Sequence, residues 1–441
     1  MYNVRVAYVT TMKDFYNLLI NTLIAGVTTS FLWFALTFWA YLETRSVLAT
    51  SIIGGSYMLM MAVTGIFFGT LVDRHKKKTV MLGATVITVL AYALGGIVYL
   101  LVPESRLLQL GGGYFWLLVI VILCGAIVEN IRNIAMSTCV TLMVPKERRD
   151  KANGMVGAAT GLAFAITSVF SGLVIGMLGM GWALGLAIGL TTVSLLHLLF
   201  VRIPEHGIAH DPTLTKHIDI PGAWAAIRAV PGLFWLIIFS TFNNLLGGVF
   251  MSLMDAYGLS IVSVETWGLL WGVLSFAFMV GGVIVAKKGL GARPLRLLLL
   301  ANVVMWVVSI GFTLRESIWL MAAGMFIYLL LIPVVEAAEQ TAIQRVVPYQ
   351  KQGRVFGLAQ SFEAAAAPIT AFLIGPIAQF GLIPYMQSDA GQQAFGWLLG
   401  SGNARGIALV FVIAGVIGLA VTLWAFTTRA YRTLSAAYAD A

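Results

Sequence analysis

The sequence is poor in charge. Asp, Glu, Lys and Arg make up only 10% of its 441 residues, whereas 60% are hydrophobic. A soluble domain carries about 25% charged residues. This composition excludes an ordinary water-soluble fold and indicates that most of the chain is solvated by lipid.

Cysteines and catalytic motifs are equally scarce. The two cysteines, Cys124 and Cys139, would lie about 22 Å apart on one helix, too far for the ~7 Å that a disulfide allows. The sequence has no GxxxxGK[ST] phosphate loop, no His or Cys at metal-ligand spacing and no evident nucleophile with its base. We therefore expect no enzyme, no catalytic residue, no metal or cofactor, and no use of ATP by this chain.

Long apolar stretches are abundant instead. A helix needs roughly 20 mainly apolar residues to cross the hydrocarbon core of a bilayer. The sequence predicts twelve such spans, at 15–40, 46–71, 79–102, 114–141, 152–178, 182–201, 232–256, 264–286, 294–314, 317–342, 354–381 and 405–428. The predicted fold class is an all-α membrane protein with twelve transmembrane helices.

The positions of Lys and Arg predict the orientation. With the N-terminus inside, 22 of the 27 Lys and Arg residues fall in cytoplasmic segments and four in outer ones. Such a bias is typical of cytoplasmic loops, so we expect a multi-pass protein of the cytoplasmic membrane with both termini cytoplasmic. The net charge of +9 is explained by topology and does not require a nucleic-acid partner.

The chain divides into two similar parts. A polar interruption at 202–231 separates a bundle at 1–201 from one at 232–441. Val144, Pro145, Lys151 and Gly154 after the fourth span correspond at one constant offset to Val347, Pro348, Arg354 and Gly357 after the tenth. Parallel repeats of this kind form transporters that hold substrate between the halves. The polar segment 384–402 is predicted to be an exposed outer loop.

A charged hinge follows the second span. It contains Gly69, Asp73, Arg74, Lys77 and Lys78. With the span count and the repeat, this hinge resembles the signature loop of the major facilitator superfamily. The resemblance implies two pseudo-symmetric six-helix bundles and a latch, with Asp73 as its acid, that holds the cytoplasmic helix ends together in the outward-open state.

The corresponding loop of the second half, 282–288, has no acid, so we expect one strong latch in the first half. Segments 165–176 and 332–340 are similar to the multidrug and macrolide efflux branch, a group of drug:proton antiporters. The fifth span lacks the Gly-Pro element that many antiporters of the family carry. The resemblance further suggests a monomer.

The charged residues that fall well inside the predicted spans, away from their ends, are Glu129, Arg132, Glu336, Glu339 and Glu363. A charge in the hydrocarbon costs about 2.5–3.5 kcal/mol on insertion scales and is a functional candidate by default. Glu129 and Arg132 are three residues apart and share a helix face. They form either a structural salt bridge or a switch, because arginine keeps a carboxylate ionised and burial without a partner favours its protonation.

The remaining acids have no cation close by in sequence. Glu336 and Glu339 share a face of the tenth span and are predicted to be a proton site or an element that attracts cations, unless the inner surface hydrates them. Glu363 precedes Pro368 in the eleventh span. It could carry a proton, contact a cationic substrate or pair with Arg354.

In the family that the chain resembles, the first and seventh spans line the central cavity. Asn17, Asn21, Asn243 and Asn244 are therefore candidate substrate contacts, as are the aromatic residues Phe31 and Phe34. The alternatives are hydrogen bonds between helices for the amides and an interfacial aromatic belt for the rings.

These observations predict a secondary active transporter that exchanges lipophilic or cationic drugs for protons by alternating access. A carrier of the same fold for a metabolite, siderophore or lysophospholipid is the alternative. A membrane-embedded enzyme or sensor would need a catalytic cluster or an output domain, and the sequence indicates neither. The expected partners are the small-molecule substrate, protons and the lipid bilayer.

Overall fold

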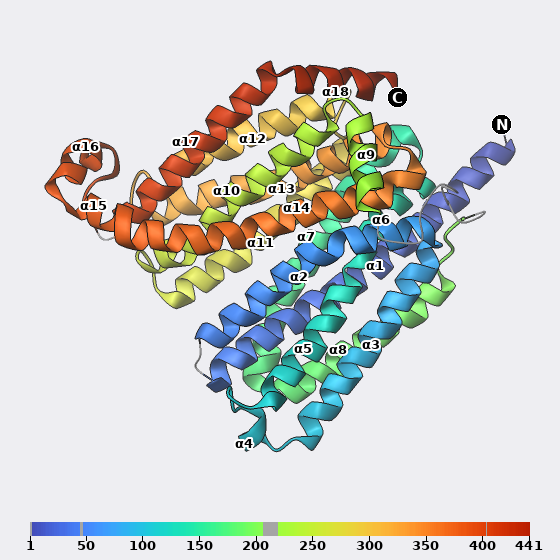
Figure 1. The fold of residues 1–441 in the computed structure, drawn as a ribbon, viewed down its shortest axis with the longest axis horizontal. Coiled ribbons are helices and arrows are strands. Elements are labelled where there is room, and N and C mark those ends of the chain that lie inside the picture. The colour runs from blue at the N-terminus through green and yellow to red at the C-terminus, as the bar shows by residue number, and fades with distance from the viewer. Residues whose placement is uncertain (1, 45–46, 206–218, 403) are drawn as a thin grey trace.

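The computed structural model describes residues 2–44, 47–205, 219–402 and 404–441, and nearly all of these are helical (Figure 1). The elements in chain order are α1 (Tyr2–Thr44), α2 (Val47–Arg74), α3 (Lys77–Leu101), α4 (Glu104–Leu107), α5 (Gly113–Glu129), α6 (Ile131–Met143), η1 (Lys146–Arg148), α7 (Arg149–Met177), α8 (Met180–Phe200), α9 (Ile220–Ala229), α10 (Leu233–Leu259), α11 (Val264–Lys288), α12 (Pro294–Gly311), α13 (Ile318–Val346), α14 (Tyr349–Pro376), η2 (Ile377–Leu382), α15 (Ile383–Gln387), α16 (Asp389–Leu399), α17 (Arg405–Thr427) and α18 (Arg429–Asp440).

Twelve stretches of these helices are long and apolar enough to cross a membrane, which confirms the predicted fold class. The fourth span, Gly113–Met143, is interrupted at Asn130, between α5 and α6. Here the backbone amides of Asn130 and Asn133 donate to the carbonyls three residues before them, Ile127 and Asn130, at 3.1 and 3.0 Å, which is the tighter 3₁₀ pattern. The break therefore lies between Glu129 and Arg132, two of the intramembrane charges.

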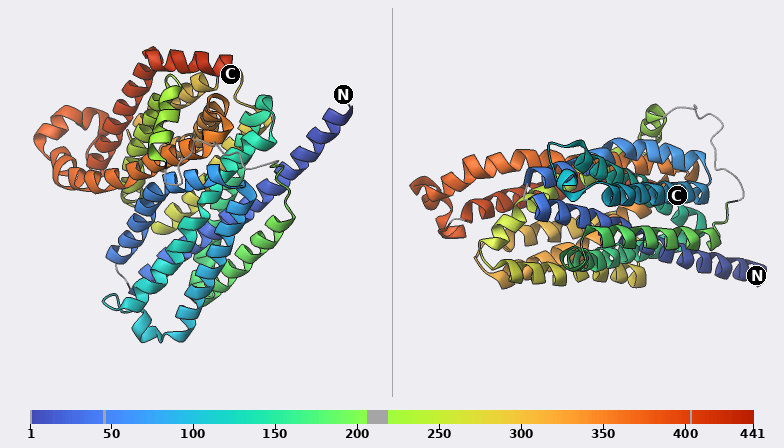
Figure 2. Two further views of the ribbon diagram at one scale, coloured as in Figure 1. Left: turned by 45° about the vertical axis from the view of Figure 1, so that its right-hand side comes forward. Right: turned by 90° about the horizontal axis from the view of Figure 1, so that it is seen from below.

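The helices form two sets. Figures 1 and 2 show α1–α8 on one side and α10–α18 on the other, with the two sets together at the end that bears both termini. They are far apart at the opposite end, where α4 belongs to one set and α15 and α16 to the other. The arrangement is a V whose closed end carries the termini.

Glycines allow the sets to meet at the closed end. A Cβ on Gly69 of α2 would collide with the backbone of Gly353 in α14, and one on Gly65 would collide with Gly357 and Ser361. Between α7 and α11, Gly154 lies equally close to the backbone of Ala286. Small residues let helices approach this closely in lipid, so the two sets touch through their backbones.

The prediction of a loop at 384–402 is wrong, because this segment forms most of α15 and all of α16. The Ser388 hydroxyl caps α16 by accepting a hydrogen bond from the Gly391 amide. Arg315 and Arg405 then donate hydrogen bonds to the carbonyls of Leu398 and Leu399 at the end of α16. Of the predicted linker 202–231, residues 206–218 lie outside the described part of the chain, and residues 220–229 form the helix α9.

Candidate functional site

A polar cavity of about 320 Å³ lies between the two sets of helices. One wall comes from α1, α6 and α7, and the other from α13 and α14. Its lining residues are Thr22, Asn133, Ile134, Met136, Ser137, Val156, Thr160, Glu336, Glu339, Gln340, Ile343, Phe356, Ala359, Gln360 and Glu363. Both sets of helices contribute, so any movement of one set against the other changes the cavity.

Three of the predicted coupling residues meet in this cavity. Glu336 and Glu339 lie one turn apart on α13, and Glu363 of α14 lies beside Glu339. Glu336 is exposed, Glu363 is half-buried and Glu339 is buried. One Glu339 oxygen accepts a hydrogen bond from the Ser240 hydroxyl at 2.7 Å, and the Glu339 carboxyl also faces that of Glu363. The three side chains thus differ in how much of their surface is open to the cavity, Glu336 most and Glu339 least.

No lysine, arginine or histidine is among the described residues that line this cavity. None of the ion pairs between described residues includes Glu336, Glu339 or Glu363 either. The described residues also hold no group of three or more His, Cys, Asp and Glu placed to bind a metal ion. Carboxylates brought together in a low dielectric repel one another unless something neutralises them. A proton or a cationic molecule can do so here.

Glu129 and Arg132 lie in a different environment. Their ion pair, 3.2 Å from Arg132 Nε to Glu129 Oε1, is buried within the first set of helices. Thr85 and Thr88 of α3 donate hydrogen bonds to the two Glu129 oxygens at 3.3 and 3.1 Å. Arg132 donates to the Thr85 hydroxyl and to the Asn21 side-chain oxygen. Neither charged residue lines the polar cavity.

Asp73 joins the two sets at the closed end. Its oxygens accept hydrogen bonds from the backbone amides of Gly353 and Arg354, at 2.7 and 2.9 Å, near the start of α14. The Arg354 Nε also lies 3.1 Å from Asp73. A helix N-terminus favours a carboxylate electrostatically, and Asp73 is 1% exposed, so water does not compete for it.

Asp219, at the start of the linker helix, extends this contact. One Asp219 oxygen accepts a hydrogen bond from Arg354 Nη1 at 2.8 Å. The other accepts a hydrogen bond from the Gly222 backbone amide and so caps the start of α9. Arg354 therefore holds acids from α2 and from the linker. It does not pair with Glu363, because nine residues on one helix are two and a half turns and leave the two side chains on opposite faces.

The other hinge residues lie around Asp73. Gly69 is in backbone contact with Gly353, and Arg74 ends α2. Lys77 is buried, with its Nζ 3.7 Å from Glu205 and 5.0 Å from the centre of the Tyr349 ring. Lys78 donates a hydrogen bond to the Leu199 carbonyl at 2.8 Å. Together these residues connect α2 and α3 to the start of the linker and to α14.

A second acid acts at the pseudo-equivalent place. Asp150 at the start of α7 accepts a hydrogen bond from the Leu290 amide, just after α11, at 2.8 Å. The loop 282–288 contains no acid, and the structure supplies one from the helix on the opposite side of the contact. The repeat offset aligns residue 150 with Gly353, the residue that contacts Asp73, and was the sequence signal that could have pointed to Asp150.

Side-chain amides also join the two sets. The Asn153 amide on α7 donates hydrogen bonds to Thr341 and Gln344 of α13, both at 2.8 Å. Gln344 donates in turn to the Ser137 carbonyl of α6 at 2.8 Å. Sequence reasoning missed these residues, because nothing local distinguishes an amide that pairs across the molecule from one at the surface.

At the C-terminal helix, the Arg345 guanidinium lies over the ring of Tyr438 in α18. The distance from Arg345 Cζ to the centre of that ring is 4.7 Å. Burial raises the pKa of Tyr438, and the neighbouring Arg345 acts in the opposite direction. The neutral phenol therefore offers a ring face to the cation.

The predicted substrate contacts lie in several places. The Asn21 amide donates to the Ser194 carbonyl at 2.8 Å, and Asn243 accepts from the Trp306 indole at 3.1 Å, so both connect helices. Asn17 is half-buried and Asn244 is exposed. Phe31 and Phe34 contact rings of α7, Phe170 at 5.9 Å and Phe164 at 5.7 Å between ring centres. None of these six residues lines the polar cavity.

Curated proteins with similar sequences are exporters by name. A curated relative, macrolide efflux protein A of Streptococcus pyogenes, is 23% identical over 80% of this chain and 87% of its own length. The protein of the same name in Enterococcus faecalis is 24% identical over 73% of this chain and 98% of its own. The enterobactin exporter EntS of Salmonella typhi is 23% identical over 74% and 76%.

Solved structures share the fold at lower identity. A bacterial homologue of the iron transporter ferroportin, in an outward-facing state, superposes with a TM-score of 0.68 at 15% identity, covering 94% of this chain and all of that one. The proton:xylose symporter XylE superposes with a TM-score of 0.65 at 12% identity, covering 95% and 96%. The family model described as Major Facilitator Superfamily matches residues 18–371. The chain belongs to the major facilitator superfamily and is a membrane transporter of small molecules, not an enzyme.

Proposed function

We propose that the protein exports lipophilic, cationic or amphipathic compounds in exchange for protons, by alternating access between its two sets of helices. The observation that carries this proposal is the meeting of Glu336, Glu339 and Glu363 in one cavity without a cationic side chain among the described lining residues. Buried uncompensated charge is strongly unfavourable, so the site favours protons or a cationic substrate.

The gradation of exposure supports a proton path. Glu336 is exposed and can take up a proton from water, whereas Glu339 is buried against Ser240. A separation of α1, α6 and α7 from α13 and α14 would alter the hydration of all three acids, and hydration alters their affinity for protons. Proton binding would thereby favour one arrangement of the helices over another.

The closed end of the V supports export as the direction of transport. Asp73 with Arg354, and Asp150 with Leu290, hold the helices together at the end that bears both termini. If that end is cytoplasmic, as the Lys and Arg bias predicts, the form described is open to the outside. In such a form, an exporter releases substrate and takes up protons from the outer medium.

The coupling is tested with purified protein in proteoliposomes that carry an imposed proton gradient. We expect transport of cationic dyes and macrolides that stops when an ionophore collapses the gradient. The variant Glu339→Gln should lose gradient-driven transport, whereas Glu104→Gln, on the exposed short helix α4, should not. Transport that is indifferent to the ionophore would contradict proton coupling.

A siderophore exporter is the second candidate, because one curated relative is an enterobactin exporter. The same vesicles decide between the two. Saturable transport of a catecholate siderophore, with no transport of macrolides or cationic dyes, would replace drug efflux by siderophore export. The acids of the polar cavity favour the cationic cargo.

A further inference from the structure

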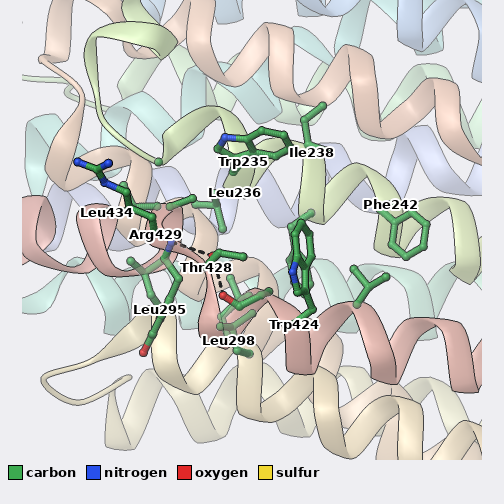
Figure 3. Close-up of a pocket in the computed structure, with 17 residues that line it drawn as sticks. Trp235, Leu236, Ile238, Phe242, Leu295, Leu298, Trp424, Thr428, Arg429 and Leu434 are labelled. Carbon is green, nitrogen blue, oxygen red and sulfur yellow. Dashed lines mark hydrogen bonds between the residues drawn. The ribbon is translucent and has the colours of Figure 1, made fainter.

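A second cavity, of about 450 Å³, lies on another part of the molecule, between α10, α12, α17 and the C-terminal helix α18 (Figure 3). It shares no lining residue with the polar cavity. Its walls are apolar and include Trp235, Phe242, Leu295, Leu298 and Trp424. We call it the terminal groove. Its volume is within the roughly 300–1,000 Å³ of pockets that hold small ligands.

The terminal groove runs along the membrane-spanning helices from their ends. Gly232 and Arg429, at the start of α10 and of α18, lie at one end of it. In Figure 3, Trp424 lies between the Arg429 end and Phe242. From Trp235 to Phe242 the helix rises about 10 Å. The groove therefore extends from the level of the helix ends toward the middle of the bilayer.

Large aromatic side chains line the groove and are open to the surroundings. Trp235 is 56% exposed and Trp424 is 63% exposed. Tryptophan is enriched where a membrane protein meets the headgroup level of the bilayer. Since α10, α12 and α17 span the membrane, the medium that reaches these indoles is lipid, and a hydrocarbon chain is the occupant that matches the apolar walls.

The end of the groove is positively charged. Arg429 is exposed and has no ion pair or side-chain hydrogen bond to any described residue. The neighbouring Thr428 hydroxyl is already engaged, because it accepts the Tyr431 amide and starts α18. Arg293 and Arg296 are exposed within one turn of Leu295. None of the described lining residues is acidic.

We propose that the terminal groove binds an anionic phospholipid from the leaflet on the side of the two termini. One acyl chain would lie against Leu295, Leu298 and Trp424, and the phosphate would lie on Arg429. Basic residues near the membrane surface attract anionic lipids, and basic pockets between membrane helices bind anionic headgroups. The terminal groove shares no lining residue with the polar cavity, so lipid binding here can be measured separately from transport.

Brominated lipids test the occupant, since bromine quenches indole fluorescence on contact. The protein is reconstituted in bilayers of brominated phosphatidylcholine with increasing brominated phosphatidylglycerol, and the quenching due to Trp424 is taken as the difference from Trp424→Phe. We expect phosphatidylglycerol to be preferred about fivefold at Trp424, the ratio that about 1 kcal/mol gives. Trp319, which is 82% exposed in α13, is the control and should show no preference.

Two arginine variants separate a site from a general attraction to charge. Arg429→Ala should abolish the preference at Trp424, whereas Arg432→Ala should keep it, because Arg432 hydrogen bonds to the Thr427 carbonyl and does not line the groove. Native mass spectrometry of both variants should show the same loss and retention of bound phosphatidylglycerol. Equal quenching by the two lipids in the unmodified protein, or equal effects of the two variants, would overturn the proposal.

Discussion

Two groups of intramembrane acids differ in one respect, the presence of a cation. Glu129 lies in the first set of helices with Arg132 and two threonine hydroxyls around it. Glu339 and its neighbours Glu336 and Glu363 lie between the sets, with one serine hydroxyl and no cation among the described lining residues. A buried carboxylate whose partners are all in its own bundle keeps them when the bundles move. A carboxylate that lies between the bundles without such partners has different surroundings after the bundles move.

The largest expected effect tests the group without a cation. Glu339→Gln and Glu363→Gln keep the shape of the side chain and remove its ionisable group, so gradient-driven transport should fall to that of protein-free vesicles. Substrate exchange without a gradient should persist, because it needs no net proton movement. Vesicle transport with and without a gradient measures both, and loss of exchange alone would contradict the proposed role.

The next effect tests the partnered group. Arg132→Ala leaves Glu129 buried without its cation, and breaking a buried pair in this way costs about 3–5 kcal/mol of stability. Thermal unfolding in detergent should show a large fall in the midpoint. The double variant Glu129→Leu with Arg132→Met should recover most of it, because no lone charge then remains. If instead Arg132→Ala unfolds normally and only proton coupling is lost, the comparison between the two groups fails.

A smaller effect is expected for an acid whose partner belongs to the opposite set. Asp73→Asn weakens the hydrogen bonds to Gly353 and Arg354, which for a charged acceptor contribute about 1.5–3 kcal/mol. The loss should appear as opening of the closed end and not as unfolding. Reaction of a cysteine introduced at Ser361, which lies against Gly65, reports the opening. An unchanged reaction rate would contradict a latch at Asp73.

The smallest effect is expected at the open end of the V, where a cation has several partners. Arg405 is buried and pairs with Glu316 at 2.9 Å, but it also donates to the Thr313 and Leu399 carbonyls and the Tyr257 hydroxyl. The Glu316 side chain is 49% exposed. Glu316→Gln should therefore cost less than about 1 kcal/mol. A loss as large as that of Arg132→Ala would mean that the number of partners does not decide the cost.

Sequence patterns predicted the spans because their signal is local. About 20 apolar residues in a row have few other interpretations, and all twelve predicted spans correspond to helices. The helix α16 was missed because Gln392, Gln393 and two glycines make it look like a polar turn. In the structure, a serine cap and two arginines on its last carbonyls stabilise the helix instead.

The candidate site was predictable in part. The helical period places Glu336 and Glu339 on one face, and it also places Glu129 beside Arg132. The meeting of Glu363 with Glu339 depends on how α14 packs against α13, and no local pattern encodes that. The same holds for Arg354, which contacts Asp73 and Asp219 across 281 and 135 residues of chain.

The seam between α2 and α14 is built from Gly65, Gly69, Gly353 and Gly357. When these four residues come together, none of them has a side chain to order, because glycine has no side-chain entropy to lose. A seam of long side chains would have to order them at every cycle. If the two sets of helices separate and meet again in each transport cycle, this part of their contact can therefore form and break with little loss of side-chain entropy.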